Sequence, residues 1–519
     1  MAKEAYDIWW GKASEKEIKE AFAFCEEYTA FLNACKTERE CTDYAVERLT
    51  KKKFIPLDKI LSRDAGKKPS LKPGDKVFRT VWGKAVLAAV IGKQPVSAGV
   101  NIVATHIDSP RLDLKPSPFY EDSHMVLAKT RYYGGIKKYQ WVCVPLALRG
   151  VVYLKDGSKV TISVGDKEGD PCFIITDLLP HLAYRQMDKK ANEVITGEGL
   201  NVLLGSMPEI KPGNGADAVK ADAGKASAAD KGATVKDLSG KDAPGKGAEE
   251  SATAKDAASD DKAGQAVKAN LLRILKETYG IDEIDFVSAE IEAVPALAAK
   301  DIGFDRSMIG GYGHDDRVCS YAALKALMDI KGTPERTTVV YLADKEEVGS
   351  QGNTGAQSAA LGNFLAELCA AGDGAYTDLT ARRCFASSFV ISGDVASAVD
   401  PNFKDVQDHF NANFIGKGMV LEKYTGRGGK GGGNDANPEY IAALRQIFDT
   451  EGVAWQTGEL GRVDLGGGGT VAAFMANMGM QVVDGGVPML CMHAPYEVVS
   501  KGDVYNTYKG YKAFLTSMK

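Results

Sequence analysis

Hydrophobic residues along the chain fall into two kinds of pattern, which together predict an α/β fold. Short, nearly continuous apolar runs are typical of strands buried on both faces, and they occur at about 76–80, 85–91, 99–105, 339–343 and 387–392. Apolar positions with helical spacing predict helices within 13–63 and at about 317–330, 357–370 and 500–517. We expect a further short strand at 453–456 and a last strand of the same sheet at 488–492. Thr37 is a predicted N-cap for one of the early helices.

The pattern changes between residues 117 and 200, where short segments alternate between apolar and polar residues. Examples are Gly150-Val-Val-Tyr-Leu-Lys and Lys159-Val-Thr-Ile-Ser-Val. Such alternation is typical of antiparallel strands with one exposed face, so we expect a β-rich region. A helix at 271–279 and a strand at 283–290 are predicted before the α/β pattern returns near Met308.

Residues 205–267 consist mainly of Ala, Lys, Asp, Gly and Ser, with almost no large apolar side chains. A segment of this composition cannot bury enough apolar surface to form a core. We therefore interpret it as a flexible, low-complexity insertion that provides solubility and spacing but no chemistry.

Composition excludes several classes of protein. The chain has 519 residues, 44% of them hydrophobic and 26% charged, which is typical of a globular protein. Its net charge of −5 gives no general attraction to nucleic acid or anionic membrane, and no apolar stretch is long enough to span a bilayer. The first residues lack a signal-peptide pattern. Nine scattered cysteines without a Cys-x-x-Cys pair indicate reduced thiols in the cytoplasm and no zinc–thiolate site.

Side chains of the metal-ligand type follow several predicted strands or begin a helix: His106 and Asp108, Asp315 or Asp316, Glu346 and Glu347, Asp394, and His493. Each has an ordinary structural explanation when it is taken alone. Because ligands bind at the carboxyl ends of strands in open α/β sheets, their coincidence favours a metal site. Two histidines with several carboxylates and no sulfur suit two zinc, manganese or cobalt ions. Asp108 is suitably spaced to orient the imidazole of His106.

Five segments resemble the M18 aminopeptidases, the aspartyl aminopeptidase family of clan MH, in its bacterial form. In chain order they are Thr105-His-Ile-Asp-Ser-Pro, Asp315-Asp-Arg, Glu346-Glu-Val-Gly-Ser, Ser392-Gly-Asp-Val-Ala and Leu490-Cys-Met-His. The resemblance covers nearly the whole chain outside 205–267. It implies a zinc-peptidase-like catalytic domain with a doubly wound mixed sheet, formed by residues 1–116 and 295–519. It also implies an inserted β-rich dimerisation domain at 117–294.

The same resemblance implies a role for each site residue. The metal ligands would be His106, Asp315, Glu347, Asp394 and His493. Asp315 would bridge two divalent ions, with Asp316 as the alternative. Glu346 would be the general base on the water between the ions, and Asp108 would support His106. Zinc is the expected metal, with manganese or cobalt as alternatives.

The family also implies an assembly, because its inserted domain dimerises and the dimers build a dodecamer with an enclosed chamber. Pro180-His181-Leu-Ala matches a segment of the insert that approaches a neighbouring subunit's active site. His181 is therefore an additional candidate for metal or substrate contact, with a purely structural histidine as the favoured interpretation. The expected partners are peptide substrates and other copies of the chain.

Three positions depart from the aspartyl-specific pattern. Ser397 stands where such members have a histidine, the Lys that would bind an acidic side chain falls near Glu422-Lys423, and the following Tyr falls near Asn434. If Glu422 occupies the Lys position, an acidic substrate side chain would be repelled. We therefore expect an aminopeptidase that prefers neutral or basic N-terminal residues. The alternatives are a carboxypeptidase or deacylase of the same clan and a scaffold or cargo protein with reduced activity.

Overall fold

The computed structural model describes residues 7–62, 70–209, 265–374 and 376–519. It separates into two compact units. The larger contains the chain up to Pro118, residues 128–203 and residues 283–519, and the smaller contains residues 119–127 and 204–282. Most of the predicted low-complexity insertion at 205–267 lies outside the described residues.

A nine-stranded mixed sheet forms the centre of the larger unit. Strand β4 pairs in parallel with β13 on one side and β14 on the other, whereas β3 runs antiparallel to β13. In sheet order the strands are β1 (Ile55–Pro56), β2 (Lys76–Val81), β3 (Ala85–Val90), β13 (Thr337–Ala343), β4 (Val100–His106), β14 (Phe389–Ser392), β18 (Gln481–Gly486), β16 (Met419–Glu422) and β17 (Trp455–Thr457).

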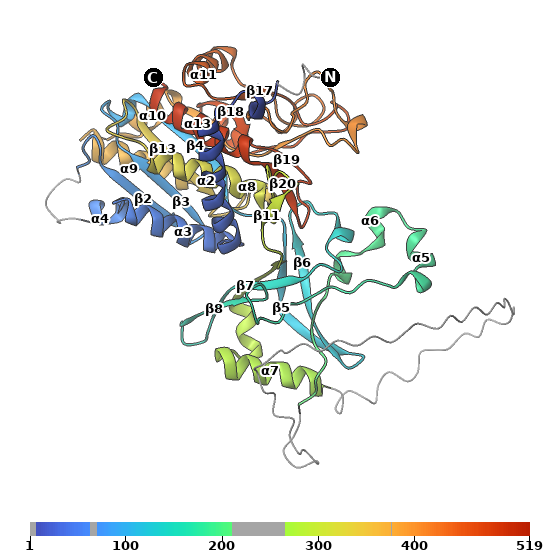
Figure 1. The fold of residues 1–519 in the computed structure, drawn as a ribbon. Helices are drawn as coiled ribbons and strands as arrows, with labels where there is room; N and C mark the ends of the chain where they lie inside the picture. The colour runs from blue at the N-terminus through green and yellow to red at the C-terminus, as the bar shows by residue number, and fades with distance from the viewer. Residues whose placement is uncertain (1–6, 63–69, 210–264, 375) are drawn as a thin grey trace. The chain divides into compact units, whose positions relative to one another are not determined.

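Helices cover both faces of this sheet (Figure 1). In β3, Val86, Ala88 and Val90 join one hydrophobic core, and the alternating residues Ala85, Leu87 and Ala89 join the other. The first core contains residues of α2 (Glu15–Ala34), α3 (Glu38–Lys51), α8 (His314–Met328), α11 (Pro438–Thr450) and α13 (Lys501–Ser517). The second contains residues of α4 (Leu57–Leu61), α9 (Ala360–Gly372), α10 (Asp378–Ala386) and α12 (Ala472–Asn477). The prediction of a doubly wound mixed sheet is thus confirmed.

Local sequence fixes where the first long helices begin. Both α2 and α3 start with a capping box, Ser14 with Glu17 and Thr37 with Glu40. In each box the hydroxyl of the cap residue accepts a hydrogen bond from the backbone N–H of the Glu three residues later. The carboxylate of that Glu accepts a hydrogen bond from the backbone N–H of the cap residue, so two otherwise unpaired donors are satisfied. The predicted cap at Thr37 is confirmed.

A separate five-stranded sheet corrects one prediction. Its strands, in order, are β11 (Lys300–Ile302), β12 (Met308–Gly311), β20 (Glu497–Ser500), β19 (Pro488–Leu490) and β15 (Ala396–Ser397). The segment 488–492 was expected in the large sheet, and that expectation is wrong. The place beside β14 belongs to β18, whose sequence Gln-Val-Val-Asp-Gly-Gly has too few large apolar residues to be recognised as a buried strand.

The region between the two parts of the α/β pattern contains a six-stranded sheet, as its alternating segments predict. In order the strands are β8 (Lys159–Val164), β7 (Leu146–Tyr153), β10 (Ala289–Pro295), β5 (Arg111–Asp122), β6 (Met125–Tyr133) and β9 (Val202–Gly205). Strand β10 runs antiparallel to both β7 and β5. The strand predicted at 283–290 is wrong, because Glu283–Ser288 is a 3-10 helix with Ile284 and Val287 exposed.

The smaller unit is built around α7 (Ala266–Tyr279). The side chain of Glu121 accepts the amides of Val267 and Lys268 at 2.9 Å, which satisfies two donors at the start of this helix. The short helices α5 (Tyr184–Met187) and α6 (Ala191–Val194) belong to the larger unit. Among the described helices, we find none with the length and apolar character required to cross a membrane.

Candidate metal centre

Three parallel strands bring their polar ends to one edge of the large sheet. His106 is the last residue of β4 and pairs with Ala343, the last residue of β13. Glu346 and Glu347 follow β13 in the 3-10 turn Glu346–Val348, and Asp394 follows β14 on the other side of β4. The parallel register therefore places four predicted site residues together, as expected for the carboxyl edge of such a sheet.

Asp315 lies between the two histidines. Its Oδ1 is 3.3 Å from Nε2 of His106, and its Oδ2 is 3.1 Å from Nε2 of His493. Asp315 belongs to the first turn of α8, and its peptide bond to Asp316 is cis. The carboxylate of Asp316 points elsewhere, since its Oδ2 accepts the backbone N–H of His106 at 3.4 Å.

Two groups of possible ligand atoms share His106. One contains His106, Glu346 and Asp394, and the other contains His106, Asp315 and Glu347, with the ligand atoms of each group within 4.8 Å of one another. Nε2 of His493 lies 3.5 Å from Oε2 of Glu347, so this imidazole borders the second group. All five predicted metal ligands, together with Glu346, therefore converge within the larger unit.

Burial makes this concentration of acids costly without a cation. Burial, reinforced by neighbouring carboxylates, raises the pKa of Glu346 to about 8 and the pKa of Glu347 well above its usual range. Oε1 of Glu347 is buried and forms no hydrogen bond with any described residue. A divalent cation would compensate the clustered charges, and imidazole nitrogens with carboxylate oxygens are the donors that zinc takes in such sites. The residues present therefore fit the expected metal.

Asp108 fixes the residues around it from a completely buried position. Its Oδ1 accepts the amide of Glu346 and its Oδ2 accepts the amide of Glu347, both at 3.2 Å. Nδ1 of His106 lies 3.4 Å from Oδ1 and 3.0 Å from the Asp108 carbonyl oxygen. These contacts orient the imidazole so that Nε2 faces the acidic cluster.

Glu497 is a site residue that the sequence analysis missed. Its Oε1 accepts the amide of His493 at 2.8 Å, and its Oε2 accepts the amide of Asp315 at 3.1 Å. Only 1% of Glu497 is exposed. The sequence Glu497-Val-Val-Ser offered one signal, because two adjacent valines predict a buried segment. A carboxylate at the start of such a segment is rarely buried without a partner, so Glu497 could have been considered as a site residue.

Two other histidines do not join the centre in the described chain. His181 lies in the exposed 3-10 turn Pro180–Leu182 and belongs to neither ligand group. Nδ1 of His314 lies 2.6 Å from the hydroxyl of Tyr28, and burial lowers the pKa of this histidine to about 3. His314 is thus a neutral, hydrogen-bonded residue beneath the site.

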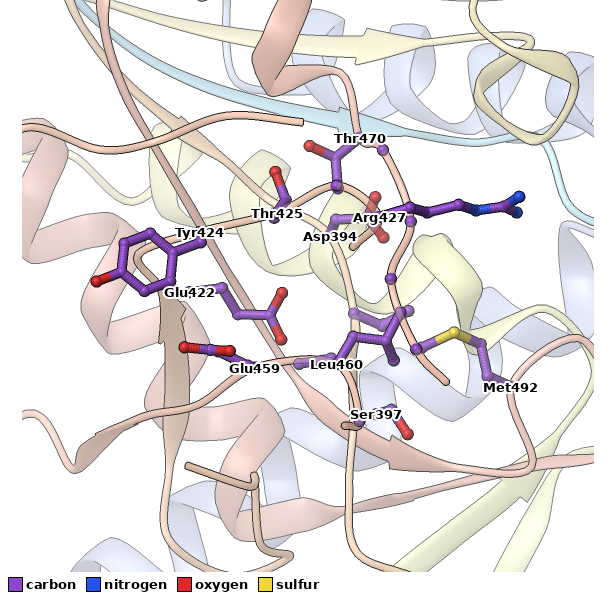
Figure 2. Close-up of a pocket in the computed structure, with 18 of the residues that line it drawn as sticks. Asp394, Ser397, Glu422, Tyr424, Thr425, Arg427, Glu459, Leu460, Thr470 and Met492 are labelled. Atoms are coloured by element: carbon purple, nitrogen blue, oxygen red, sulfur yellow. The ribbon is translucent and has the colours of Figure 1, made fainter. Parts of the chain in front are cut away.

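A cavity of about 530 Å³ adjoins the cluster and includes Asp315, Glu346, Asp394 and His493 in its lining. Figure 2 shows Glu422 and Glu459 on its wall, with the side chain of Arg427 extending away from them. Its remaining lining includes Ser397, Tyr424, Met492 and the glycine loop 466–469. The cavity is therefore large enough for an amino-acid side chain and opens directly onto the acidic cluster.

Glu422 is the residue on which the predicted substrate preference depends. Its Oε1 accepts a hydrogen bond of 3.2 Å from the side-chain amide of Asn413. Burial, with a contribution from Asp484, raises the pKa of Glu422 to about 8. The contribution of Glu459 to the same wall was not predicted, because nothing in the local sequence links it to the strand ends.

Comparisons with known proteins show the family and the fold of this chain. The profile of the family described as aminopeptidase I zinc metalloprotease (M18) matches residues 31–515. A probable M18 family aminopeptidase 1 of Clostridium acetobutylicum is 44% identical over 509 residues, covering 98% of this chain and 97% of that protein. The crystal structure of an M18 aminopeptidase from Thermotoga maritima matches with a TM-score of 0.83 at 38% identity, covering 98% and 99% of the two chains.

Two further solved structures have a similar fold. Aminopeptidase I from Clostridium acetobutylicum matches with a TM-score of 0.81 at 42% identity, covering 98% of this chain and 99% of that chain. The mApe1 dodecamer of S. cerevisiae matches with a TM-score of 0.68 at 19% identity, covering 95% and 96%. The likeness to the yeast protein concerns the fold alone.

Proposed function

The chain belongs to the M18 family and is a zinc metalloaminopeptidase, and from this premise we propose how its residues release N-terminal residues from peptides. The observation that carries the proposal is the position of Asp315, whose two oxygens face His106 and His493 beside Glu346. Of these groups, Asp315, Glu346 and His493 line the cavity.

Two divalent ions would be held by His106, Asp315, Glu347, Asp394 and His493, with Asp315 shared between them. Zinc is the proposed metal because imidazole and carboxylate donors dominate, with manganese and cobalt as alternatives. When bound, such a pair polarises a scissile carbonyl and lowers the pKa of a water molecule. The two oxygens of Asp315, 3.3 and 3.1 Å from different imidazoles, support this residue over Asp316 as the bridge.

Glu346 is the proposed general base. Its side chain is 17% exposed and lines the cavity, whereas the adjacent Glu347 side chain is 3% exposed. Glu346 removes a proton from the attacking water and transfers it to the leaving amine as the peptide C–N bond breaks. Asp108 supports this step because it holds the backbone of Glu346 and the imidazole of His106.

The proposed substrates carry a neutral or basic N-terminal side chain. Glu422 and Glu459 line the cavity, and a carboxylate in the substrate would meet them as a like charge. A lysine or arginine side chain would instead offset the burial that raises the pKa of Glu422, since an opposite charge favours the ionised acid.

The proposed assembly is a dodecamer built from dimers, in which residues 117–294 form the oligomerisation domain and residues 1–116 with 295–519 the catalytic domain. Support comes from the six-stranded sheet, most of which lies between residues 117 and 294, and from the dodecameric yeast protein of the same fold. The exposed turn with His181 is available for contact with a neighbouring subunit. The nine unpaired cysteine thiols support a reducing, cytoplasmic location.

Turnover of a panel of aminoacyl-nitroanilides by metal-free and zinc-restored enzyme tests the function. We expect activity only after zinc is restored, with Leu and Lys substrates preferred over Asp. A strong Asp preference would overturn the substrate assignment alone. Hydrolysis of N-acetylated substrates would instead indicate a deacylase or carboxypeptidase of the same clan, and zinc binding without any turnover would indicate a scaffold.

A further inference from the structure

Tyr133, the last residue of β6, and the two glycines that follow it, Gly134 and Gly135, contact or approach residues of the metal centre. The hydroxyl of Tyr133 donates to Oδ2 of Asp108 at 2.8 Å. The carbonyl oxygen of Gly135 lies 2.8 Å from Nδ1 of His493. Asp108 and His493 lie far apart in the chain, and this short segment contacts both of them.

We propose that the Tyr133–Gly135 segment is a positioning element for the metal ligands, acting through Asp108, Glu347 and His493. The inference rests on the proposed function, because it assigns this segment to the same site. The proposal gives a role to the sequence Tyr132-Tyr-Gly-Gly. No role was assigned to it from the sequence, because the candidate metal ligands were residues that follow a predicted strand or begin a helix.

The first contact fixes Asp108. This carboxylate is fully buried and accepts the amides of Glu346 and Glu347 in addition to the Tyr133 hydroxyl. Burial and the charge of Asp108 raise the pKa of Tyr133, so the phenol remains an O–H donor. Without this donor, Oδ2 would retain only its bond to the Glu347 amide, and the orientation of the carboxylate that supports His106 would be less constrained.

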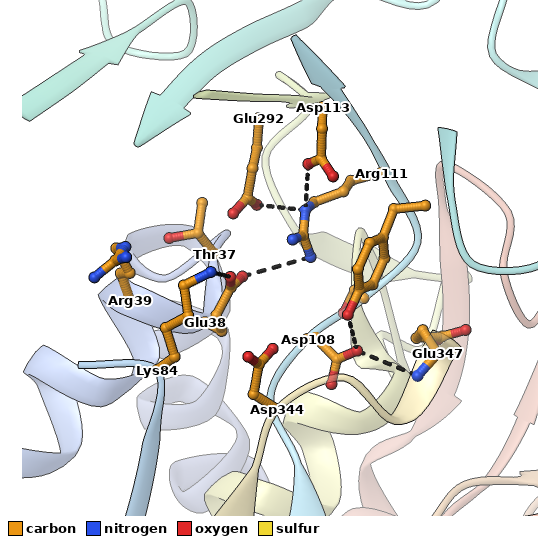
Figure 3. A network of polar contacts seen from close by, with 12 residues as sticks. Thr37, Glu38, Arg39, Lys84, Asp108, Arg111, Asp113, Glu292, Asp344 and Glu347 are labelled. Carbon is orange, nitrogen blue, oxygen red and sulfur yellow. Dashed lines mark hydrogen bonds and ion pairs between the residues drawn. The ribbon is translucent and has the colours of Figure 1, made fainter. Parts of the chain in front are cut away.

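Arg111 holds the Tyr133 ring in place. Its guanidinium carbon lies 3.8 Å from the ring centroid, which is within the range of a cation–π contact. Figure 3 shows Arg111 among Glu38, Asp113 and Glu292. The guanidinium lies 3.5, 2.8 and 3.2 Å from the carboxylates of these three residues, in that order. Because Arg111 is itself held by three carboxylates, the ring of Tyr133 is packed against a fixed surface.

The second contact sets the tautomer of His493. A carbonyl oxygen can only accept, so its 2.8 Å contact with Nδ1 requires the proton on that nitrogen. In the neutral imidazole, Nε2 then keeps its lone pair, and this is the atom 3.1 Å from Asp315. The Gly135 carbonyl therefore orients His493 for ligation through Nε2.

Gly134 permits the close approach between these two contacts. Its φ of +76° is a conformation that L side chains rarely adopt, and a Cβ there would lie 3.1 Å from Oε2 of Glu347. Any larger residue would push against the Glu347 carboxylate. The effect of backbone strain can be measured separately at Gly157. This residue has a similar φ of +84°, but a Cβ added there would meet no atom within 4 Å.

Zinc titration of the metal-free protein, combined with steady-state kinetics on a Leu-nitroanilide, tests the inference. For Tyr133→Phe, which keeps the ring under Arg111, we expect zinc affinity and kcat each to fall about tenfold while KM changes little. Tyr132→Phe is the matched control, because the neighbouring ring is 46% exposed. Zinc affinity and kcat of Tyr133→Phe equal to those of the control would overturn the proposal.

Gly134→Ala and Gly157→Ala form a second matched pair. Both substitutions add a methyl group at a positive φ, but only the methyl group at position 134 would contact the carboxylate of Glu347. We expect weaker zinc binding in Gly134→Ala alone. Equal zinc affinities in the two variants would contradict the proposal that the Tyr133–Gly135 segment positions the metal ligands. The titration measures binding without turnover, so it distinguishes failure of this inference from failure of the proposed aminopeptidase activity.

Discussion

Glu346 and Glu347 are neighbours in the chain, but their carboxylates face different imidazoles. Oε2 of Glu346 lies 3.9 Å from Nε2 of His106, and Oε2 of Glu347 lies 3.5 Å from Nε2 of His493. The 3-10 turn separates them, since successive side chains in such a turn point about 120° apart. Glu346 is the more exposed and lines the cavity, whereas Glu347 is enclosed, so the two acids are suited to different tasks.

Replacing these two acids should therefore have different consequences. Glu346→Gln should retain zinc but lose a factor of about 10²–10⁴ in kcat, because general-base catalysis contributes on that order. Glu347→Gln should lose zinc as well, because it removes a charged ligand. Zinc content by elemental analysis and nitroanilide turnover measure the two effects. Wild-type turnover in Glu346→Gln, or full zinc content in Glu347→Gln, would refute the corresponding assignment.

Removal of metal should abolish activity and lower stability together. A metal that binds only the folded state adds about 2.7 kcal/mol when its concentration is a hundred times Kd, so chelation should lower Tm. Zinc should restore both properties, whereas Mg²⁺ should not, because Mg²⁺ prefers oxygen ligands and the site contains two histidines. Turnover and thermal unfolding with and without chelator are the measurements. Full activity after exhaustive chelation would contradict the metal assignment.

The strand ends could be predicted because their evidence is local. The run Val339–Ala343 is followed by a charged cluster, and Val100–Thr105 is followed by His106. In each segment, an apolar run that predicts a buried strand is followed directly by a side chain that can bind a metal. The parallel pairing of β4 with β13 and β14 then brings those ends together. For this reason the proximity of His106, Glu346 and Asp394 could be predicted without knowledge of the packing.

Contacts between distant segments could not be predicted in this way. Glu497 binds the amides of both His493 and Asp315, and Tyr133 reaches Asp108 from the inserted sheet. Neither residue follows a strand of the large sheet, so the pattern that predicted the candidate ligands does not apply to them. The strand β18 was missed for a related reason, since its pairing with β14 compensates for a weakly apolar sequence.

Glu422 should determine which N-terminal side chains are accepted. Glu422→Gln should lower kcat/KM for a Lys-nitroanilide about 10–100-fold, because a hydrogen bond to a charged group contributes about 1.5–3 kcal/mol. The Leu-nitroanilide serves as the internal control, since its side chain carries no charge. Glu422→Lys should raise activity on the Asp substrate. An unchanged Lys-to-Leu ratio in Glu422→Gln would show that this wall does not contact the substrate side chain.

Asp503 provides a pH-dependent contribution to stability through buried hydrogen bonds to the backbone of Gly416 and Gly418. It is fully buried, and its two oxygens accept the amides of Gly416 and Gly418 at 2.7 Å each. Burial raises the pKa of this carboxyl to about 7, against the lowering effect of those two amides. The unfolded chain releases the same proton near the ordinary value of 3.8. Between these values the folded state binds more protons than the unfolded state, so the free energy of unfolding falls as pH rises.

This contribution should be complete below about pH 4 and lost by about pH 7, with a slope of about 1.4 kcal/mol per pH unit between them. Asp503→Asn cannot ionise, so its free energy of unfolding should lack this slope. Urea unfolding of zinc-loaded wild type and variant at several pH values gives the difference between their free energies of unfolding. The contributions of the other titrating groups cancel in this difference. Asp43→Asn, at an exposed position of α3, is the control and should follow the wild type. Parallel curves for wild type and Asp503→Asn would mean that the pKa of Asp503 in the folded protein stays near its ordinary value of 3.8, held there by its two backbone donors.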